Sequence, residues 1–212
     1  MKIAVVSEFT ADEAALKVLI DAILGAKTDL ISATRLRPMG WTSVFQMLPA
    51  IIKDLHYNRP DADGLVVVID SDESPLHDET HEDSAYKAAG CRLCSLRGIV
   101  TREFSRLSIV PNRGTLKVAI GLAVPAIEAW YRCGFDPHIT EFEWARKLRG
   151  ERLTYDKKSL KESVYGSDPV SNIRRIELAK QAALRLTANL DQLEQRFPNG
   201  FGSLLRDLSG WL

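Results

Sequence analysis

The sequence has few cysteines, no net charge and no long hydrophobic run, and each absence excludes a class of protein. Only three of its 212 residues are Cys, an odd number that cannot pair completely within the chain, so we expect no disulfide-stabilised secreted domain. No run of about 18 apolar residues occurs, which excludes a transmembrane helix. The apolar segment 3–6 is too short for a signal peptide. We therefore expect a cytoplasmic protein without a membrane partner.

Charge of one sign is also lacking, because 28 basic side chains balance 28 acidic ones. A formal net charge of zero excludes a histone-like protein that coats nucleic acid through a uniformly basic surface. Acidic residues are nevertheless in excess over 1–75, and basic residues are in excess over 101–212. A local nucleic-acid groove is therefore compatible with this composition. No glycine-rich phosphate loop occurs, which argues against hydrolysis of nucleoside triphosphates.

Short apolar segments alternate with amphipathic ones over the first 135 residues, which favours a mostly parallel sheet flanked by helices. The expected strands are 2–7, 30–36, 65–69 and 116–122. The expected helices between and after them are 10–24, 42–55, 85–96 and 125–133. Beyond these the pattern is helical. We therefore expect an α/β domain over 1–135 and a helical extension over 136–212 that packs on it.

Residues typical of helix ends define several boundaries. Thr10 and Glu13 have the spacing of a capping box, and Thr140 with Glu143 repeats it. Gly25 is typical of the residue that follows a helix. These patterns predict helices that begin at residue 10 and near residue 140.

Proline marks further boundaries. Pro125 is expected in the first turn of its helix, and the pair Asp168-Pro169 is expected to open a long helix that runs to about residue 190. Pro49 lies inside a predicted helix, which it should kink or restart.

Four acidic residues follow predicted strands. Glu8 follows the first strand, Asp70 and Asp72 follow the most apolar strand, and Glu128 lies on the helix after the fourth. The carboxyl ends of parallel strands meet at one edge of a sheet, where ligands gather. Converging carboxylates repel one another unless a proton or cation intervenes, and oxygen ligands suit Mg²⁺ or Mn²⁺. We predict a metal site of Glu8, Asp70 and Asp72, with Glu128 as a further ligand or the general base.

Basic residues near these positions are candidates for contacts with phosphate. Arg92 and Arg97 belong to a basic series that follows the acidic segment, and Lys157 lies further along the chain. The alternative for all three is a solvated position on a helix surface. For Glu128 the alternative is a carboxylate favoured by the positive end of its helix.

The acidic pattern resembles that of the Toprim domain, the fold shared by topoisomerases, primases and overcoming-lysogenization-defect nucleases. In that family a Glu follows the first strand and an Asp-x-Asp follows a later central strand, and the matching residues here are Glu8 and Asp70-Ser71-Asp72. Phe9 stands where the family usually has Gly. The resemblance implies a Toprim-like α/β fold and divalent-metal chemistry on nucleic acid.

A second set of residues is similar to small bacterial Toprim-like proteins of unknown function. It comprises the segment Ala126-Ile127-Glu128-Ala129-Trp130 after a strand and the later Tyr155-Asp156-Lys157-Lys158. This resemblance covers about residues 1–165. It implies a role in phage defence, with an ATPase or another defence-system protein as a candidate partner.

Two His and two Cys have spacings found in zinc sites. His77 and His81 are followed by Cys91 and Cys94, so that each pair could supply two ligands to a structural Zn²⁺. The alternatives are buried core thiols and, for His77, a place in the loop of the divalent-metal site. A redox Cys-x-x-Cys normally opens a helix directly after a strand, which does not fit here.

Three functions are compatible with these residues. The first is a divalent-metal-dependent phosphodiesterase, a nuclease that acts on DNA or RNA. The second is a Toprim-like binding or regulatory subunit of a defence complex that does not cut. The third is a metal-dependent phosphatase with an Asp nucleophile, in which Glu8 and Glu128 would have no clear role.

Overall fold

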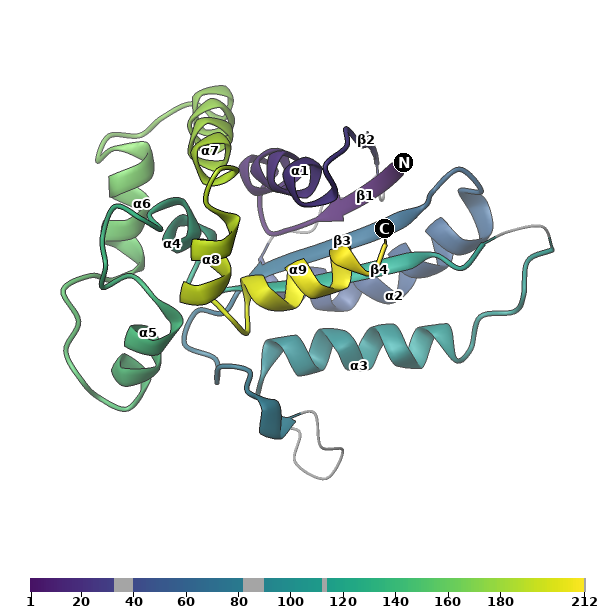
Figure 1. Cartoon of the computed structure of the whole chain (residues 1–212). Helices are drawn as coiled ribbons and strands as arrows, with labels where there is room; N and C mark the ends of the chain where they lie inside the picture. The colour runs from purple at the N-terminus through teal and green to yellow at the C-terminus, as the bar shows by residue number, and fades with distance from the viewer. Residues whose placement is uncertain (33–39, 82–89, 112–113, 212) are drawn as a thin grey trace.

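The computed structural model describes residues 1–32, 40–81, 90–111 and 114–211. Within them lies a four-stranded, all-parallel sheet with the strand order β2-β1-β3-β4 (Figure 1). The strands are β1 (Lys2–Val6), β2 (Asp29–Ile31), β3 (Gly64–Asp70) and β4 (Lys117–Ala123). The predicted α/β class and parallel sheet are confirmed.

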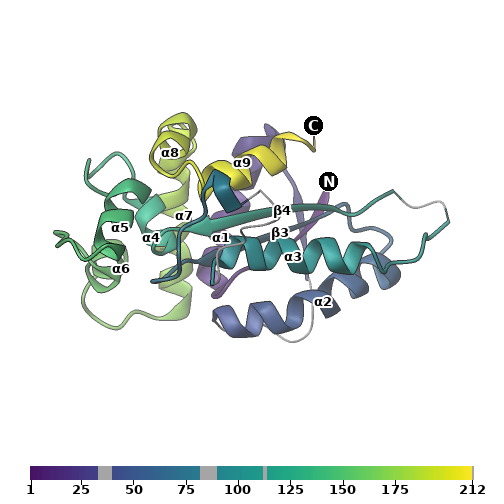
Figure 2. The same cartoon turned by 90° about the horizontal axis from the view of Figure 1, so that it is seen from below.

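Helices cover both faces of the sheet and extend beyond its carboxyl edge. Figure 2 shows α2 and α3 on one face and α9 on the other, where α1 also packs, and α4, α5 and α6 lie beyond the strand ends. The helices are α1 (Thr10–Leu24), α2 (Trp41–Asn58), α3 (Arg92–Phe104), α4 (Ile127–Tyr131), α5 (Glu141–Leu148), α6 (Lys157–Tyr165), α7 (Asn172–Leu186), α8 (Leu190–Arg196) and α9 (Phe201–Ser209), with a short 3₁₀ helix at Glu79–His81. Among the residues described, no helix is both long and apolar enough to cross a bilayer.

β3 is the most deeply placed strand. It pairs with β1 on one side and β4 on the other, and every residue from Gly64 to Asp70 is buried. Its continuous apolar sequence is explained by this position, since a parallel strand covered by helices on both faces has no polar side. Asp70, the one charged residue of β3, is its last residue and lies at the carboxyl edge of the sheet.

The C-terminal helix α9 lies along the open edge of β4. The backbone N–H of Ile120 donates to Asp207 Oδ2 at 2.9 Å, and its carbonyl oxygen accepts from Ser203 Oγ at 3.1 Å. The N–H of Leu122 donates to the carbonyl oxygen of Gly200 at 3.3 Å. The C-terminal helices therefore pack on the sheet, as expected, while the boundary at residue 135 stays a prediction.

Several predicted helix ends are confirmed and one cap is wrong. α1 begins at Thr10 and ends before Gly25, whose φ is +60°. However, Thr10 does not cap the helix: Phe9 holds the N-cap position and supplies no side-chain hydrogen bond. The second capping pattern is confirmed, because Thr140 Oγ1 accepts from the N–H of Glu143 at 3.1 Å.

Other boundaries are displaced from their predicted positions. The helix predicted over 85–96 begins only at Arg92, after Gly90 with φ of +88°, and residues 85–89 lie outside the described part. β2 ends at Ile31, and the predicted residues 33–36 are also outside it.

The proline signals are partly wrong. α4 begins at Ile127, after Pro125, and α7 begins at Asn172, after Pro169. The later start of α7 has a physical cause, since Ser171 Oγ accepts from a backbone N–H in the first turn at 3.2 Å and so caps it. α2 runs through Pro49 without a break.

Candidate active site

The carboxyl ends of β1 and β3 meet where the winding of the sheet reverses. The chain leaves β1 through α1 on one face and leaves β3 through α3 on the other (Figure 1, Figure 2). Ligands of open parallel sheets bind in the crevice at this point. Glu8 lies two residues past β1, and its Oε1 accepts a 3.2 Å hydrogen bond from the backbone N–H of Asp70. Two of the predicted metal ligands are therefore adjacent.

Asp70 is held by one helix N-terminus and one ammonium group. Its side chain is buried, Oδ1 accepts from the N–H of Ile127 at 3.1 Å, and Oδ2 accepts from Lys157 Nζ at 3.1 Å. Burial raises the pKa of Asp70 above its usual range, although Lys157 opposes the rise.

Asp72 projects from a backbone with φ of +50°, a conformation that Asp tolerates better than most residues. Its carboxylate accepts from Arg92 at 2.7 Å and from Lys157, while its carbonyl oxygen accepts from Trp144 Nε1 at 3.0 Å. Burial would raise the pKa of Asp72, but the hydrogen bonds from Lys157 and Arg92 outweigh it and lower that pKa.

Glu128 lies in the first turn of α4 and is buried, with 4% of its surface exposed. Its Oε2 has no hydrogen-bond partner among the described residues. Burial and then the negative charge of Asp70 raise the pKa of Glu128 to about 7. A carboxyl group with this pKa exchanges its proton close to neutral pH.

Asp12 completes the acidic cluster, and the sequence analysis missed it. It lies in the first turn of α1 and is buried, and its pKa is raised well above the usual value by burial and by the charges of Asp70, Glu128 and Glu8. The signal was present, because Asp12 shares the buried helix face with Ala15 and other apolar residues at helical spacing. We define the acidic cluster as Glu8, Asp12, Asp70, Asp72 and Glu128.

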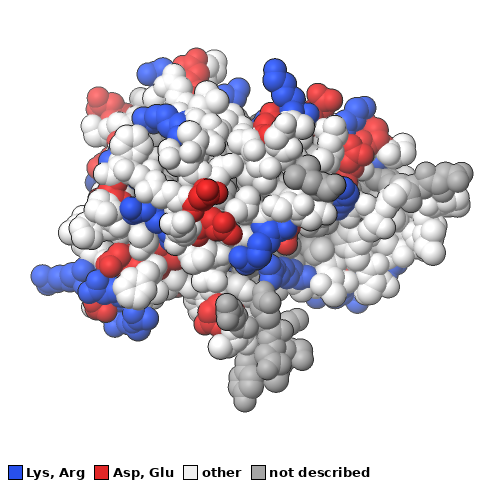
Figure 3. Space-filling model, in the orientation of Figure 1, with Lys and Arg blue, Asp and Glu red and all other residues white. Residues whose placement is uncertain are grey.

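A cavity of about 440 Å³ opens beside the acidic cluster and is lined by side chains of both charges. Acidic and basic groups line it in equal number: Asp12, Glu128, Glu162, Asp168, Lys157, Lys158, Lys161 and Arg175. On the molecular face drawn in Figure 3, acidic and basic side chains are interspersed, and no broad surface of one sign appears. The basic side chains of this cavity are therefore a local feature among acidic ones.

The predicted phosphate contacts separate into two groups. Lys157 and Arg92 join the acidic cluster, and Arg92 also donates to the carbonyl oxygen of Asp70 at 2.6 Å. Arg97 is directed elsewhere, since its guanidinium donates to Ser203 Oγ of α9 at 2.9 Å. The basic series alone could not separate Arg92 from Arg97, because it does not show which neighbouring element each side of α3 faces.

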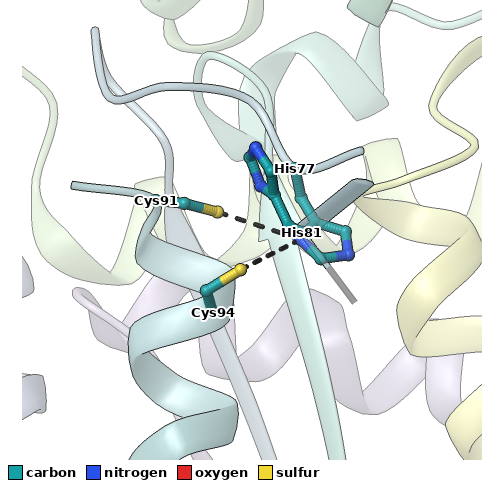
Figure 4. Close-up of side chains that lie close together, drawn as sticks. All are labelled: His77, His81, Cys91 and Cys94. Atoms are coloured by element: carbon teal, nitrogen blue, oxygen red, sulfur yellow. Dashed lines mark hydrogen bonds between the residues drawn. The ribbon is translucent and has the colours of Figure 1, made fainter. Parts of the chain in front are cut away.

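The four predicted zinc ligands come together at the N-terminus of α3. Figure 4 shows His77, His81, Cys91 and Cys94 converging on one point, and their ligand atoms all lie within 4.8 Å of one another. Such a set could hold a metal ion.

No protein-family model, curated protein or solved structure matches this chain. The interpretation of both clusters therefore rests on their geometry.

The raised pKa values predict how stability depends on pH when no divalent ion is bound. A folded chain that keeps the Glu128 proton up to about pH 7, while the unfolded chain releases it near 4.5, loses stability as pH rises through that interval. We expect the Tm in chelator to fall over this range. Over the same range the wild type should lose at most about 3 kcal/mol of unfolding free energy through Glu128, and Glu128→Gln should not show this loss.

Calorimetry from pH 4.5 to 8 measures this slope, with Glu73→Gln as control because Glu73 is exposed and pairs with Lys147 at 3.1 Å. The assignment of the proton to Glu128 is wrong if the Glu128→Gln and wild-type profiles run parallel.

Proposed function

We propose that this chain is a divalent-metal-dependent phosphodiesterase that cleaves DNA or RNA. One observation carries the proposal: five carboxyl groups from three separate segments converge at the winding reversal of a parallel sheet, beside a cavity with basic side chains. Carboxylates of this number are tolerable together only when protons or a cation neutralise them. The resemblance to Toprim-like proteins points to the same chemistry.

Glu8, Asp70 and Asp72 are the residues that would hold Mg²⁺ or Mn²⁺. The donor set fits these ions, because it consists of carboxylate oxygens alone. The buried Glu128 Oε2 without a partner also fits a position beside an ion and its water. When bound, the ion supplies charge neutralisation for the phosphate and acidifies the attacking water.

Glu128 acts as the general base. Its side chain is buried, one oxygen is without a partner in the described structure, and its pKa of about 7 matches a neutral working pH. It takes the proton that the attacking water releases. Burial, and then the charges of Asp70 and Glu128, raise the pKa of Asp12 well above its usual value, which favours its neutral form and limits the negative charge around Glu128.

Lys157 and Arg92 hold the phosphate. Both contact Asp72 in the structure, so their charges already lie at the place where a phosphodiester would approach the metal ligands. Lys161, on the same helix as Lys157, lines the adjacent cavity and contacts the continuing nucleic-acid backbone.

A binding subunit that does not cut is the second candidate, and one observation favours it. Lys157 bridges Asp70 and Asp72, and its ammonium group neutralises them without a metal ion. A permanent ion pair of this kind would make the site a structural anchor for α6 rather than a metal centre.

Incubation of the purified protein with plasmid, single-stranded DNA and RNA in Mg²⁺, Mn²⁺ or chelator distinguishes the candidates. Cleavage that requires the ion supports the nuclease. Binding of nucleic acid without cleavage, with or without the ion, supports the binding subunit. Hydrolysis of a small phosphomonoester alone, or no effect of either ion on binding and cleavage, contradicts the proposed function.

A further inference from the structure

A second side-chain cluster lies apart from the carboxyl groups and has different chemistry. His77 lies in the segment after β3, His81 ends the 3₁₀ helix, Cys91 precedes α3, and Cys94 lies in its first turn (Figure 4). The Nδ1 atom of His77 is 3.3 Å from Cys94 Sγ and 3.9 Å from Cys91 Sγ. We call these four residues the His/Cys cluster.

The distances in the His/Cys cluster are close to those of a tetrahedral zinc site. With zinc bonds of about 2.0–2.3 Å, ligand atoms lie about 3.3–3.8 Å apart. Two of the separations already fall near this range, and the widest, 4.8 Å, needs a contraction of about 1 Å. Two imidazoles with two thiols form the donor set of Cys₂His₂ zinc sites.

Burial and hydrogen bonding favour a ligand over core packing. All four side chains are buried, with exposed fractions from 0% for Cys91 to 9% for His81. His81 Nδ1 is buried without a hydrogen-bond partner among the described residues. Its other ring nitrogen, Nε2, lies 3.7 Å from Asp78 Oδ2, so that a small shift would bring an outer carboxylate into hydrogen-bond distance of the imidazole.

The His/Cys cluster is also joined to the acidic cluster through Arg92. This residue lies between Cys91 and Cys94 in the sequence, and its guanidinium packs 5.1 Å from the Trp41 ring centroid while it donates to Asp72. The position of its backbone is therefore set by the same turn of α3 that carries both thiols.

We propose that the His/Cys cluster binds one structural Zn²⁺, which ties the N-terminal turn of α3 to the segment after β3 and so positions Arg92 against Asp72. The zinc is separate from the catalytic divalent ion, and its binding does not depend on the proposed function. Zinc binding displaces the two thiol protons to solvent, because thiolates are the ligands.

Elemental analysis of the purified wild-type chain is the direct test, and we expect about one zinc per chain. Replacement of zinc by Co²⁺ should give the intense visible bands of a tetrahedral site and a thiolate-to-metal charge-transfer band. Cys91→Ser and Cys94→Ser should lose zinc and the charge-transfer band. Cys133→Ser is the matched control, because Cys133 is also a buried free thiol but lies outside the His/Cys cluster, and it should retain both.

Arg92→Met separates zinc binding by the His/Cys cluster from the contact between Arg92 and Asp72. This variant should keep its full zinc content, because it loses only that contact. Chelation of zinc from the wild type should lower its Tm but leave the Tm of Cys94→Ser unchanged. The site is refuted if the wild type has neither zinc nor a tetrahedral Co²⁺ spectrum after reconstitution, or if mass spectrometry finds Cys91 and Cys94 joined in a disulfide. These readouts do not require nuclease activity, so they stand even if the proposed function fails.

Discussion

Asp70→Asn is expected to lower the rate of ion-dependent nucleic-acid cleavage by at least about 10³-fold, since metal stabilisation of a phosphoryl transition state contributes several kcal/mol. Asp70 is the residue on which the other groups converge. It accepts from Ile127 and Lys157, and its backbone N–H donates to Glu8. Loss of one carboxylate oxygen therefore removes a metal ligand at the centre of the acidic cluster.

The fold should survive this change. Asn keeps an oxygen that can accept from the N–H of Ile127, and loss of a negative charge relieves the repulsion that acts on Glu8, Asp12 and Glu128. We expect the Tm of Asp70→Asn in chelator to equal or exceed that of the wild type, while the gain in Tm from Mg²⁺ or Mn²⁺ disappears.

Activity assays and thermal melts of the same preparations measure both effects. Glu73→Gln is the control, because Glu73 is close in sequence yet 76% of its side chain is exposed. Retention of a tenth or more of the wild-type rate by Asp70→Asn would show that no ion held by Asp70 takes part in cleavage.

Lys157→Met is expected to strengthen binding of the divalent ion while weakening catalysis. In the structure the ammonium group of Lys157 lies between Asp70 and Asp72, where it neutralises the carboxylates that a metal would need. These opposite charges raise the pKa of Lys157, so it stays protonated across neutral pH and competes with the ion. Partly buried ion pairs contribute about 1 kcal/mol or more each, so the Kd for Mn²⁺ should fall about tenfold.

The same variant should be less stable than the wild type in chelator, because Asp70 and Asp72 lose the charge that compensates them. Catalysis should fall about 100-fold, because the phosphate loses a contact. Lys158→Met is the matched control: Lys158 is the next residue on α6, with 83% of its side chain exposed, and it pairs with Glu162 at 3.7 Å.

Melting curves over a Mn²⁺ titration, together with rate measurements, test the Lys157 prediction. If Mn²⁺ raises the Tm of Lys157→Met no more than it raises the Tm of Lys158→Met, then Lys157 and the metal do not share a position. That result would favour the binding subunit, in which the Lys157 pair is permanent.

The sequence allowed prediction of those site residues whose position depends only on strand ends. In a parallel sheet, the residues after adjacent strands meet whatever the helices do, so Glu8, Asp70 and Asp72 could be assigned together. The His/Cys cluster could also be predicted, because the spacing of its ligands is visible in the sequence.

Residues whose role depends on helix phase were less accessible. Asp12 was missed because it lies inside a predicted helix, whereas acidic site residues were expected after the strands. Arg97 was grouped with Arg92 because both belong to one basic series, but the guanidinium of Arg97 lies toward α9. Positions five apart on a helix differ by about 140° in direction, so Arg92 and Arg97 face different sides of α3.

The hydrogen bonds from α9 to β4 also bear on how the chain reaches its native state. Until residues 200–209 have left the ribosome, the outer edge of β4 has unsatisfied N–H and C=O groups, which can recruit strands from other nascent chains. Folding of the sheet therefore cannot be completed before α9 has emerged. A chain shortened before α9 would expose the open edge of β4, and we expect it to associate with itself through this edge.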